Sequence, residues 1–258
     1  MMFGYFRYRM KAVSRYDLHS PFIFSVYSNI LKDSMHYQGY DPVEKLRVQL
    51  LMEPGYIKMC DLGAKSFNIP WNRKIVPLRH IINSSAVTQR FGRLLFRLVQ
   101  HFKPATILEF GTSVGISTAY MALGNPESNI ISIEGCSETL DMAEQNFQRM
   151  KLSNIRTVYG NFDTILPALL KEIGTVDLVF IDGNHREEPT LNYFQQLLPH
   201  LSPDTILVFD DIHWSTGMNS AWKKIKAHPS VKVTIDLFQC GMVFFREGLS
   251  KEDFIIRF

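Results

Sequence analysis

From about residue 104 onward, short runs of β-branched residues alternate with stretches of helical length, and this alternation restricts the fold more than any other feature. Strands that alternate with such helices form right-handed βαβ units and a parallel sheet covered by helices on both faces. We predict strands at 106–110, 129–134, 155–159, 176–181, 205–209, 231–238 and 242–246, and helices near 116–123, 138–150, 163–173, 187–200 and 216–227. The expected fold is therefore α/β, with a mostly parallel sheet of seven strands.

The two ends of this pattern differ from its middle. Only residues 239–241 separate the last two strands, which is too short for a crossover, so these strands should form an antiparallel hairpin. Before the first strand, apolar residues at helical spacing predict a helix that Ser84 or Ser85 caps, and residues 53–80 look irregular. We therefore expect a helical and irregular N-terminal extension (1–83) and a main domain (84–258).

Charge is distributed unevenly along the chain. Residues 1–103 contain 16 Lys and Arg against 6 Asp and Glu, whereas residues 104–258 contain 12 against 19. The opening stretch places Tyr5, Phe6, Tyr8 and Tyr16 among Arg7, Arg9, Lys11 and Arg15. Aromatic side chains among basic ones bind nucleic acids or membrane interfaces, and they also occur in helices packed on their own domain. The sequence leaves these alternatives open.

Several protein classes do not fit the composition. Three cysteines are too few and too scattered for a disulfide framework or a thiolate zinc site. No apolar run approaches eighteen residues, and arginines stand where a signal peptide has its apolar stretch. We expect a reduced, cytoplasmic protein without a membrane span. The apolar stretch 22–26 forms a homodimer interface or caps the sheet.

A glycine-containing turn follows the first predicted strand. The strand contains Glu109. After it, Gly111 and Gly115 allow a ligand to approach the backbone closely, and a helix N-terminus follows. The pattern is E-x-G-x-x-x-G, without the middle glycine of the dinucleotide motif, which argues against NAD. Glu109 would repel a pyrophosphate, but it is suited to accept hydrogen bonds from an ammonium group.

A second acidic residue, Glu134, closes the next predicted strand, 19 residues after Gly115. A carboxylate at this position can bind both hydroxyl groups of a ribose. A glutamate at a strand end is often only solvated, but its spacing from the glycine turn favours a binding role.

Residues 109–115 together with Glu134 resemble motifs I and II of the class I S-adenosylmethionine-dependent methyltransferases. Over residues 104–246 the chain most resembles the catechol and caffeoyl-CoA O-methyltransferases and their bacterial relatives. The resemblance implies a Rossmann-like sheet and S-adenosylmethionine as cofactor, with Gly111 beside its methionine part and Glu134 at its ribose. It also implies that Phe162 flanks the adenine and that Asp163 accepts from the adenine amino group. The residues expected to bind the cofactor are Glu109, Gly111, Ser113, Gly115, Glu134, Phe162 and Asp163.

Three further acidic residues end two later strands. Asp182 follows the fourth strand, and Asp210 and Asp211 end the fifth, so adjacent parallel strands would bring them together. Clustered carboxylates repel one another, and hard oxygen ligands suit Mg²⁺. The resemblance supports a metal at Asp182, Asp210 and Asp211, although Asp211 stands where catechol-type enzymes often have Asn. The alternatives are that these carboxylates orient substrate or solvate a strand end.

A base is needed to take the proton of an acceptor hydroxyl. His185 falls where the resembling family has a catalytic lysine, and the ordinary pKa of histidine suits proton abstraction near neutrality. We expect His185 and Asp182 to be catalytic, with His213 as the alternative base. Trp214 and Trp222 either wall an acceptor pocket or belong to the core. The expected activity is methyl transfer to a hydroxyl group of a small molecule.

Three other functions fit parts of the sequence. Ser113 lies in a G-x-S-x-G pattern, as the nucleophile of a serine hydrolase does, but that reading leaves Glu134 without a role. Methylation of RNA or another nucleic acid fits the basic N-terminal segment, yet residues 182–185 contain no base-flipping tetrapeptide. A catalytically silent protein that binds the cofactor is the third alternative.

Overall fold

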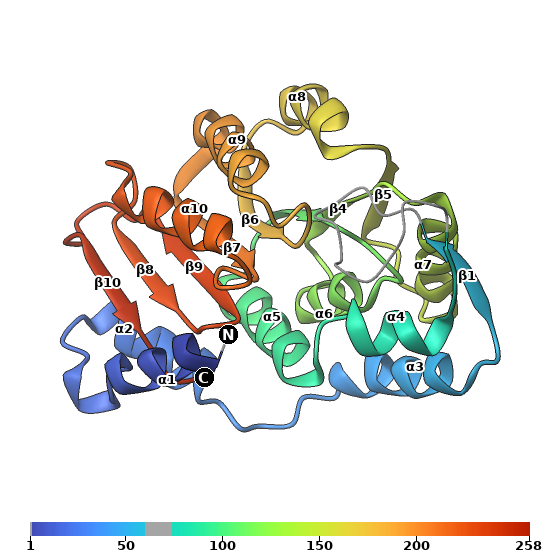
Figure 1. The fold of residues 1–258 in the computed structure, drawn as a ribbon, viewed down its shortest axis with the longest axis horizontal. Helices are drawn as coiled ribbons and strands as arrows, with labels where there is room; N and C mark the ends of the chain where they lie inside the picture. The colour runs from blue at the N-terminus through green and yellow to red at the C-terminus, as the bar shows by residue number, and fades with distance from the viewer. Residues whose placement is uncertain (1, 60–73) are drawn as a thin grey trace. The chain divides into compact units, whose positions relative to one another are not determined.

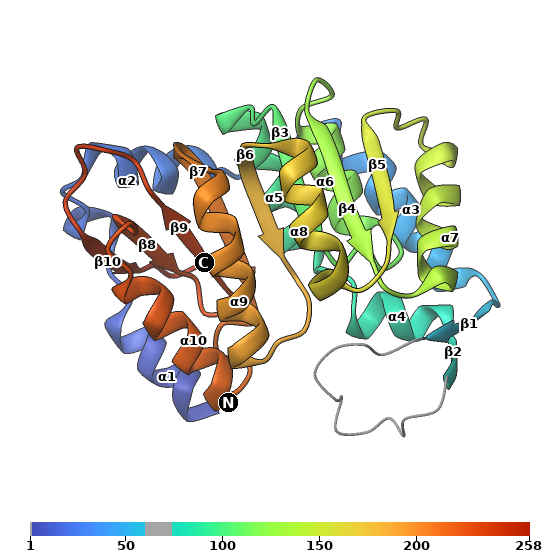
Figure 2. The ribbon, with the colours of Figure 1, turned by 90° about the horizontal axis from the view of Figure 1, so that it is seen from above.

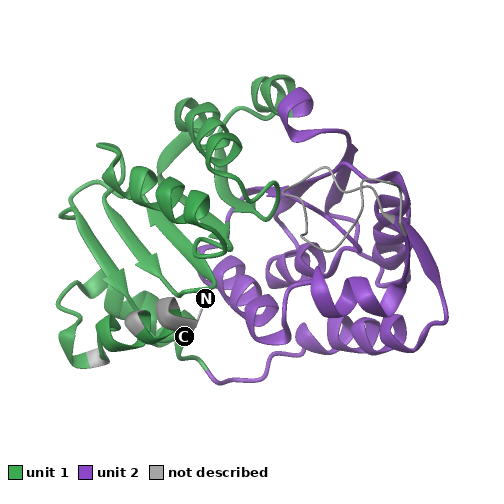
Figure 3. Ribbon diagram, in the orientation of Figure 1, with its two compact units in different colours: residues 1–33, 166–258 green, residues 34–165 purple. Residues whose placement is uncertain are grey.

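The computed structural model describes residues 2–59 and 74–258, and the chain divides into two compact units (Figure 3). Unit 1 combines Met1–Asp33 with Leu166–Phe258, and unit 2 is Ser34–Ile165. Each unit contains residues from both sides of the predicted boundary at residue 84. The division into 1–83 and 84–258 therefore stays a prediction about chain segments.

Unit 2 contains the first three strands of the alternating pattern (Figure 1). Strands β3 (Thr106–Phe110), β4 (Asn129–Glu134) and β5 (Ile155–Tyr159) pair in parallel in that order. Helices α6 (Ile116–Gly124) and α7 (Ser137–Arg149) connect them, and α8 (Phe162–Ile173) follows β5. Every residue of β3 after Thr106 is buried, as expected for a parallel strand covered on both faces. These three strand predictions are confirmed.

The segment before β3 in unit 2 contains α3 (Tyr40–Met52), α4 (Leu78–Ser84) and α5 (Gln89–Phe102). The predicted cap of α5 is wrong: the Thr88 hydroxyl accepts from the Phe91 N–H, whereas Ser84 ends α4 and donates to the His80 carbonyl. The stretch predicted as irregular contains an antiparallel pair, β1 (Tyr56–Met59) and β2 (Lys74–Pro77). The rest of that stretch, 60–73, lies outside the described residues.

Unit 1 contributes five strands in the order β10-β8-β9-β7-β6. Their bounds are β6 (Val176–Ile181), β7 (Leu201–Asp210), β8 (Val233–Asp236), β9 (Cys240–Phe244) and β10 (Glu252–Ile255). β9 runs antiparallel to β7 and β8, which confirms the predicted hairpin. β10 pairs in parallel with β8 and was not predicted. The α/β class with a mostly parallel sheet is confirmed, with eight strands instead of seven.

Helices cover both faces of the strands in unit 1 (Figure 2). On one face lie α9 (Glu187–Leu197) and α10 (Thr216–Ala227), and a Cβ atom on Gly241 of β9 would lie 2.5 Å from the Trp222 ring of α10. On the other face, Phe22 of α2 (Pro21–Val26) contacts Phe244, three residues further along β9, at 5.1 Å between ring centroids. Residues three apart on a strand point to opposite faces, so α10 and α2 cover opposite sides.

The first two helices belong to unit 1. The Tyr8 hydroxyl of α1 (Met2–Lys11) donates to the Ile256 carbonyl, and the Tyr8 ring lies 5.2 Å from the ring of Phe238. In α2, Ile23 and Val26 are fully buried, so part of the apolar stretch 22–26 packs within the unit. The homodimer stays a prediction. Among the described residues, no helix combines the length and apolar character needed to cross a membrane.

Candidate functional site

The glycine turn of unit 2 connects β3 to α6 through left-handed backbone. Gly111 has a φ of 96°, Ser113 of 49° and Gly115 of 85°. At Gly115 a Cβ atom would lie 2.5 Å from the Phe147 ring, so only glycine fits this close approach of α7. The Gly111 N–H donates to the carbonyl of Ile133 at 2.9 Å and holds the turn against the end of β4.

Glu134, at the end of β4, contacts the glycine turn directly. Its Oε2 accepts from the Ser113 N–H at 2.7 Å, and its Oε1 accepts from the Cys136 N–H at 2.9 Å. Burial raises the pKa of Glu134, and these backbone hydrogen bonds oppose that rise. The Thr139 hydroxyl and the Gly135 N–H lower the pKa as well, so several donors of the chain act on this carboxylate. The structure thus brings together the two motifs from which the cofactor site was predicted.

Glu109 is fully buried among hydroxyl groups. Its Oε1 accepts from the Ser117 hydroxyl at 2.5 Å, and its Oε2 accepts from the hydroxyls of Thr118 and Ser132 at 2.5 and 2.6 Å. The carboxylate therefore ties the first turn of α6 to β4 beneath the glycine turn. These partners were not anticipated from the sequence, and a direct contact of Glu109 with the cofactor stays a prediction.

Replacing Glu109 with glutamine is expected to lower the free energy of unfolding by about 2 kcal/mol, because an amide nitrogen cannot accept from a hydroxyl group. Urea unfolding measures the change. Glu144→Gln is the matched control, because Glu144 is exposed on α7 and accepts from one hydroxyl, that of Thr157. Equal stability of the two variants would show that the buried cluster does not depend on the charge of Glu109.

Phe162 and Asp163 lie where β5 leads into α8. The Phe162 ring is half-buried and meets the ring of Phe110 edge to face, with centroids 5.3 Å apart. Asp163 is exposed, and its backbone N–H donates to Oδ1 of Asn161 at 2.9 Å. Both residues follow β5, the strand that pairs with β4 and Glu134. Their contact with an adenine stays a prediction.

The acidic residues of unit 1 lie at the ends of two paired strands. Ile181 of β6 pairs with Phe209 of β7, so the next residues, Asp182 and Asp210, leave neighbouring strands side by side. Burial, and then the charges of Asp182 and Asp211, raise the pKa of Asp210 well above its ordinary value. Burial likewise raises the pKa of Asp211, although the charge of His185 opposes the rise. The three carboxylates thus interact as the sequence predicted.

A metal ion was predicted at this cluster. The donor chemistry fits a hard cation, because Oδ1 of Asp210 is buried without a hydrogen-bond partner among the described residues. Within residues 2–59 and 74–258, however, no group of three or more His, Cys, Asp or Glu side chains is arranged to hold a metal ion.

Replacing Asp210 with asparagine is expected to stabilise the metal-free protein by about 1–3 kcal/mol near pH 8, because the variant removes a buried charge that the charges of Asp182 and Asp211 repel. The raised pKa means that the folded state binds a proton more tightly than the unfolded state, whose carboxyl titrates near 3.8. Stability of the parent protein should therefore fall as the pH rises from 3.8 through the higher folded-state pKa.

Thermal unfolding across pH in the presence of EDTA tests this expectation. Above about pH 4, the ordinary pKa of a carboxyl group, stability should fall less in the Asp210→Asn variant than in the parent protein. Asp204→Asn serves as the control, because Asp204 is exposed on the same strand. A variant less stable than the parent at every pH would show that the buried charge of Asp210 does not destabilise the folded protein.

His185 lies three residues after Asp182, and its Nε2 is 3.5 Å from the Asp182 carboxylate. Burial lowers the pKa of His185, but the hydrogen bond and charge of Asp182, with the charge of Asp211, outweigh burial and raise the pKa. The preceding residue, Asn184, has a φ of 56° and donates to the Tyr193 hydroxyl at 3.0 Å. Asn184 also accepts from Arg186 at 2.7 Å, so a network that was not predicted fixes the turn carrying His185.

His213 uses both ring nitrogens in hydrogen bonds. Nε2 lies 2.8 Å from Oδ2 of Asp236, and Nδ1 lies 2.6 Å from Oδ1 of Asn219. The Asn219 amide nitrogen donates to the Ser215 carbonyl, which leaves Oδ1 as an acceptor toward His213. Burial lowers the pKa of His213, whereas Asp236 and Asn219 raise it to a net increase. This arrangement favours a protonated ring, so His185 is the better candidate base.

The two tryptophans near His213 differ in exposure. Trp222 is 3% exposed and its ring lies 6.4 Å from that of Phe209, so it belongs to the core and does not wall a pocket. Trp214 is 51% exposed. Only Trp214 stays available as a predicted contact for an acceptor.

Comparison with known proteins agrees with the motifs. Residues 108–212 match a family model described as a methyltransferase domain. A catechol O-methyltransferase of Niastella koreensis is 33% identical over 130 residues, which cover 49% of this chain and 58% of that protein. The chain thus spans a little more than half the length of the curated relatives it matches.

Solved structures of methyltransferases share the fold. The SAH-bound methyltransferase PaMTH1 of Podospora anserina has a TM-score of 0.61 at 13% identity, covering 89% of this chain and 97% of that one. An O-methyltransferase of Bacillus cereus in complex with SAH has a TM-score of 0.56 at 18% identity, covering 86% and 96%. Residues 108–212 are thus similar to a methyltransferase domain, and the chain shares the fold of solved methyltransferases.

Proposed function

We propose that the protein transfers a methyl group from S-adenosylmethionine to a hydroxyl oxygen of a small molecule. The observation that carries the proposal is the pair of hydrogen bonds that Glu134 accepts from Ser113 and Cys136. They hold an acidic side chain at the glycine turn, where a ribose diol can add its own hydrogen bonds. Bound S-adenosylmethionine would supply a methyl group whose bond to the sulfonium breaks as a new bond to the acceptor oxygen forms.

Unit 2 supplies the residues proposed to bind the cofactor. Glu134 accepts from the ribose hydroxyls, and the N–H groups at the start of α6 face the methionine part across Gly111 and Gly115. Ser113 helps to hold this turn through its N–H, and Glu109 supports it from below. Phe162 and Asp163 contact the adenine base.

Unit 1 supplies the residues proposed to move the proton. Nε2 of His185 donates to Asp182, which leaves Nδ1 as the acceptor atom of the neutral ring. Nδ1 takes the hydroxyl proton as the acceptor oxygen attacks the methyl carbon. Asp182 orients the ring and stabilises the imidazolium that forms, because its carboxylate lies 3.5 Å from Nε2.

A divalent ion such as Mg²⁺ is a second proposal for the acidic cluster. The unpartnered oxygen of Asp210 and the mutual repulsion of the carboxylates support it. Asp182, Asp210 and Asp211 would hold the ion, which would lower the pKa of the acceptor hydroxyl. Calorimetry with Mg²⁺ alone tests this proposal, and binding should be lost in an Asp182→Ala variant. Absence of any heat of binding would leave the carboxylates with the role of orienting the acceptor.

Calorimetric titration with S-adenosylhomocysteine, first with Mg²⁺ and then with EDTA, tests the main proposal. Micromolar binding in both buffers supports the cofactor site, and no binding in either would contradict it. Binding without methyl transfer to any of a panel of hydroxyl compounds would favour the silent alternative. Labelling of Ser113 by a fluorophosphonate would instead favour a serine hydrolase. Transfer to RNA would favour a nucleic-acid methyltransferase, and its binding should weaken steeply with salt.

A further inference from the structure

The outer face of α1 carries apolar side chains that the unit does not cover. Tyr8 points inward: it is 6% exposed and contacts Phe238 and the Ile256 carbonyl. Phe6 and Met10 are 66% and 73% exposed. Residues four apart share one face of a helix, so Phe6 and Met10 form a continuous apolar strip on the side of α1 away from this contact. The helix is therefore docked on unit 1 by one face and apolar on another.

Exposed apolar side chains concentrate at this end of the chain. The large hydrophobic residues exposed in the described part of the structure number twelve, and four of them lie within the first 16 residues. These four are Tyr5, Phe6, Met10 and Tyr16. Tyr16, in the short helix just after α1, is 87% exposed, the highest value of the twelve. A soluble surface scatters such residues singly, so their clustering indicates a surface that binds something.

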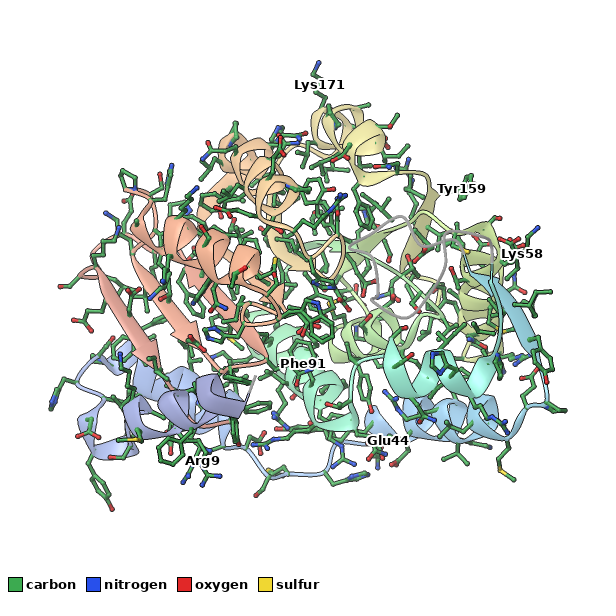
Figure 4. All side chains as sticks on the ribbon, viewed as in Figure 1. Arg9, Glu44, Lys58, Phe91, Tyr159 and Lys171 are labelled. Atoms are coloured by element: carbon green, nitrogen blue, oxygen red, sulfur yellow. The ribbon has the colours of Figure 1, made fainter. Side chains whose placement is uncertain are left out.

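The charge of the same segment indicates what it binds. Residues 1–16 contain four basic residues and no acidic one. Arg9 and Lys11, in the last turn of α1, are exposed, and Figure 4 labels Arg9. The first acidic residue, Asp17, accepts from the N–H and the hydroxyl of Ser14. The complementary partner is therefore both anionic and apolar.

We propose that α1 and Tyr16 dock this protein on the surface of a lipid bilayer with anionic headgroups. The helix would lie in the plane of the interface, with Phe6 and Met10 among the upper acyl chains and the basic side chains at the lipid phosphates. A nucleic acid satisfies the charge, and the rings of Phe6 and Tyr16 can stack on bases, but Met10 in the apolar strip has no ring, whereas a bilayer accommodates all three side chains. Ten residues are too few to span a bilayer, so docking is peripheral and reversible.

Flotation with lipid vesicles tests the proposal. The protein should bind vesicles of phosphatidylcholine with phosphatidylglycerol about tenfold more tightly than vesicles of phosphatidylcholine alone, and added salt should weaken the binding. The double variant Phe6→Ser with Met10→Ser should bind the anionic vesicles about tenfold more weakly than the parent protein, because it loses the two apolar side chains that would enter the acyl chains of the bilayer. Arg9→Glu should weaken binding to the anionic vesicles only.

The control is Met52→Ser, since Met52 is 79% exposed on α3, outside this segment, and its loss should not change vesicle binding. Circular dichroism and thermal unfolding check that every variant folds. Equal binding of the parent and the double variant would overturn the proposal, as would an absence of binding to anionic vesicles. Tighter binding to an RNA or DNA oligonucleotide than to anionic vesicles would also overturn it and assign the segment to nucleic acid. None of these outcomes depends on methyl transfer.

Discussion

Replacing Glu134 with glutamine is expected to weaken the binding of S-adenosylhomocysteine by about 10²-fold. Hydrogen bonds to a charged acceptor contribute about 1.5–3 kcal/mol, and the amide nitrogen of glutamine cannot accept at one of the two oxygens. The variant loses either the ribose contact or the bond from the Ser113 or Cys136 N–H, so the glycine turn is also held less firmly. Calorimetry at constant pH measures the change in affinity.

Glu127→Gln is the matched control. Glu127 is exposed and lies two residues before the start of β4, whereas Glu134 ends that strand. The same substitution is thus made near the end of β4 that does not meet the glycine turn. The control should bind S-adenosylhomocysteine as tightly as the parent protein does. If Glu134→Gln also kept its affinity within about threefold, less than 1 kcal/mol, the ribose would not be bound at this carboxylate. Thermal unfolding distinguishes a local loss of binding from a loss of fold.

The buried parallel strands could be predicted well because each one is a continuous run of apolar residues in the sequence. β3, β4 and β6 begin and end where the β-branched runs do, since strands covered on both faces need continuous apolar residues. The edge strand β10 could not be predicted in this way. Only half of its four residues are even partly buried, so it lacks a continuous apolar run, and its pairing with β8 is what marks it as a strand.

The candidate site shows the same contrast between local pattern and tertiary contact. The contact between Glu134 and the glycine turn could be predicted from spacing, because the ends of neighbouring parallel strands meet at one edge of a sheet. The burial of Glu109 could not, because its hydroxyl partners come from the next helix and the next strand. The choice between two histidines also needed the structure, since the partners Asp236 and Asn219 lie in other elements than His213.

Replacing His185 with glutamine is expected to lower kcat for methyl transfer by about 10²–10⁴-fold, the usual contribution of a general base. Affinity for S-adenosylhomocysteine should stay unchanged, because the proposed role of His185 is to take the proton of the acceptor hydroxyl and not to bind the cofactor. His200→Gln is the control, because His200 is a partly exposed histidine of unit 1 whose Nδ1 lies 2.8 Å from the Gly174 carbonyl. Rapid-quench measurement of a single turnover separates this loss from slow product release.

The orienting role of Asp182 makes the His185 prediction sharper. If Asp182 acts through the His185 ring, Asp182→Asn should lower kcat in the parent protein but change little once His185 is already glutamine. Residues that act as one unit are not additive in this sense. Additive losses in the double variant would instead mean that Asp182 has a separate role, such as holding the acceptor or a metal ion. An unchanged kcat in His185→Gln would contradict the assignment of His185 as the base, because removal of a general base lowers the rate of the chemical step.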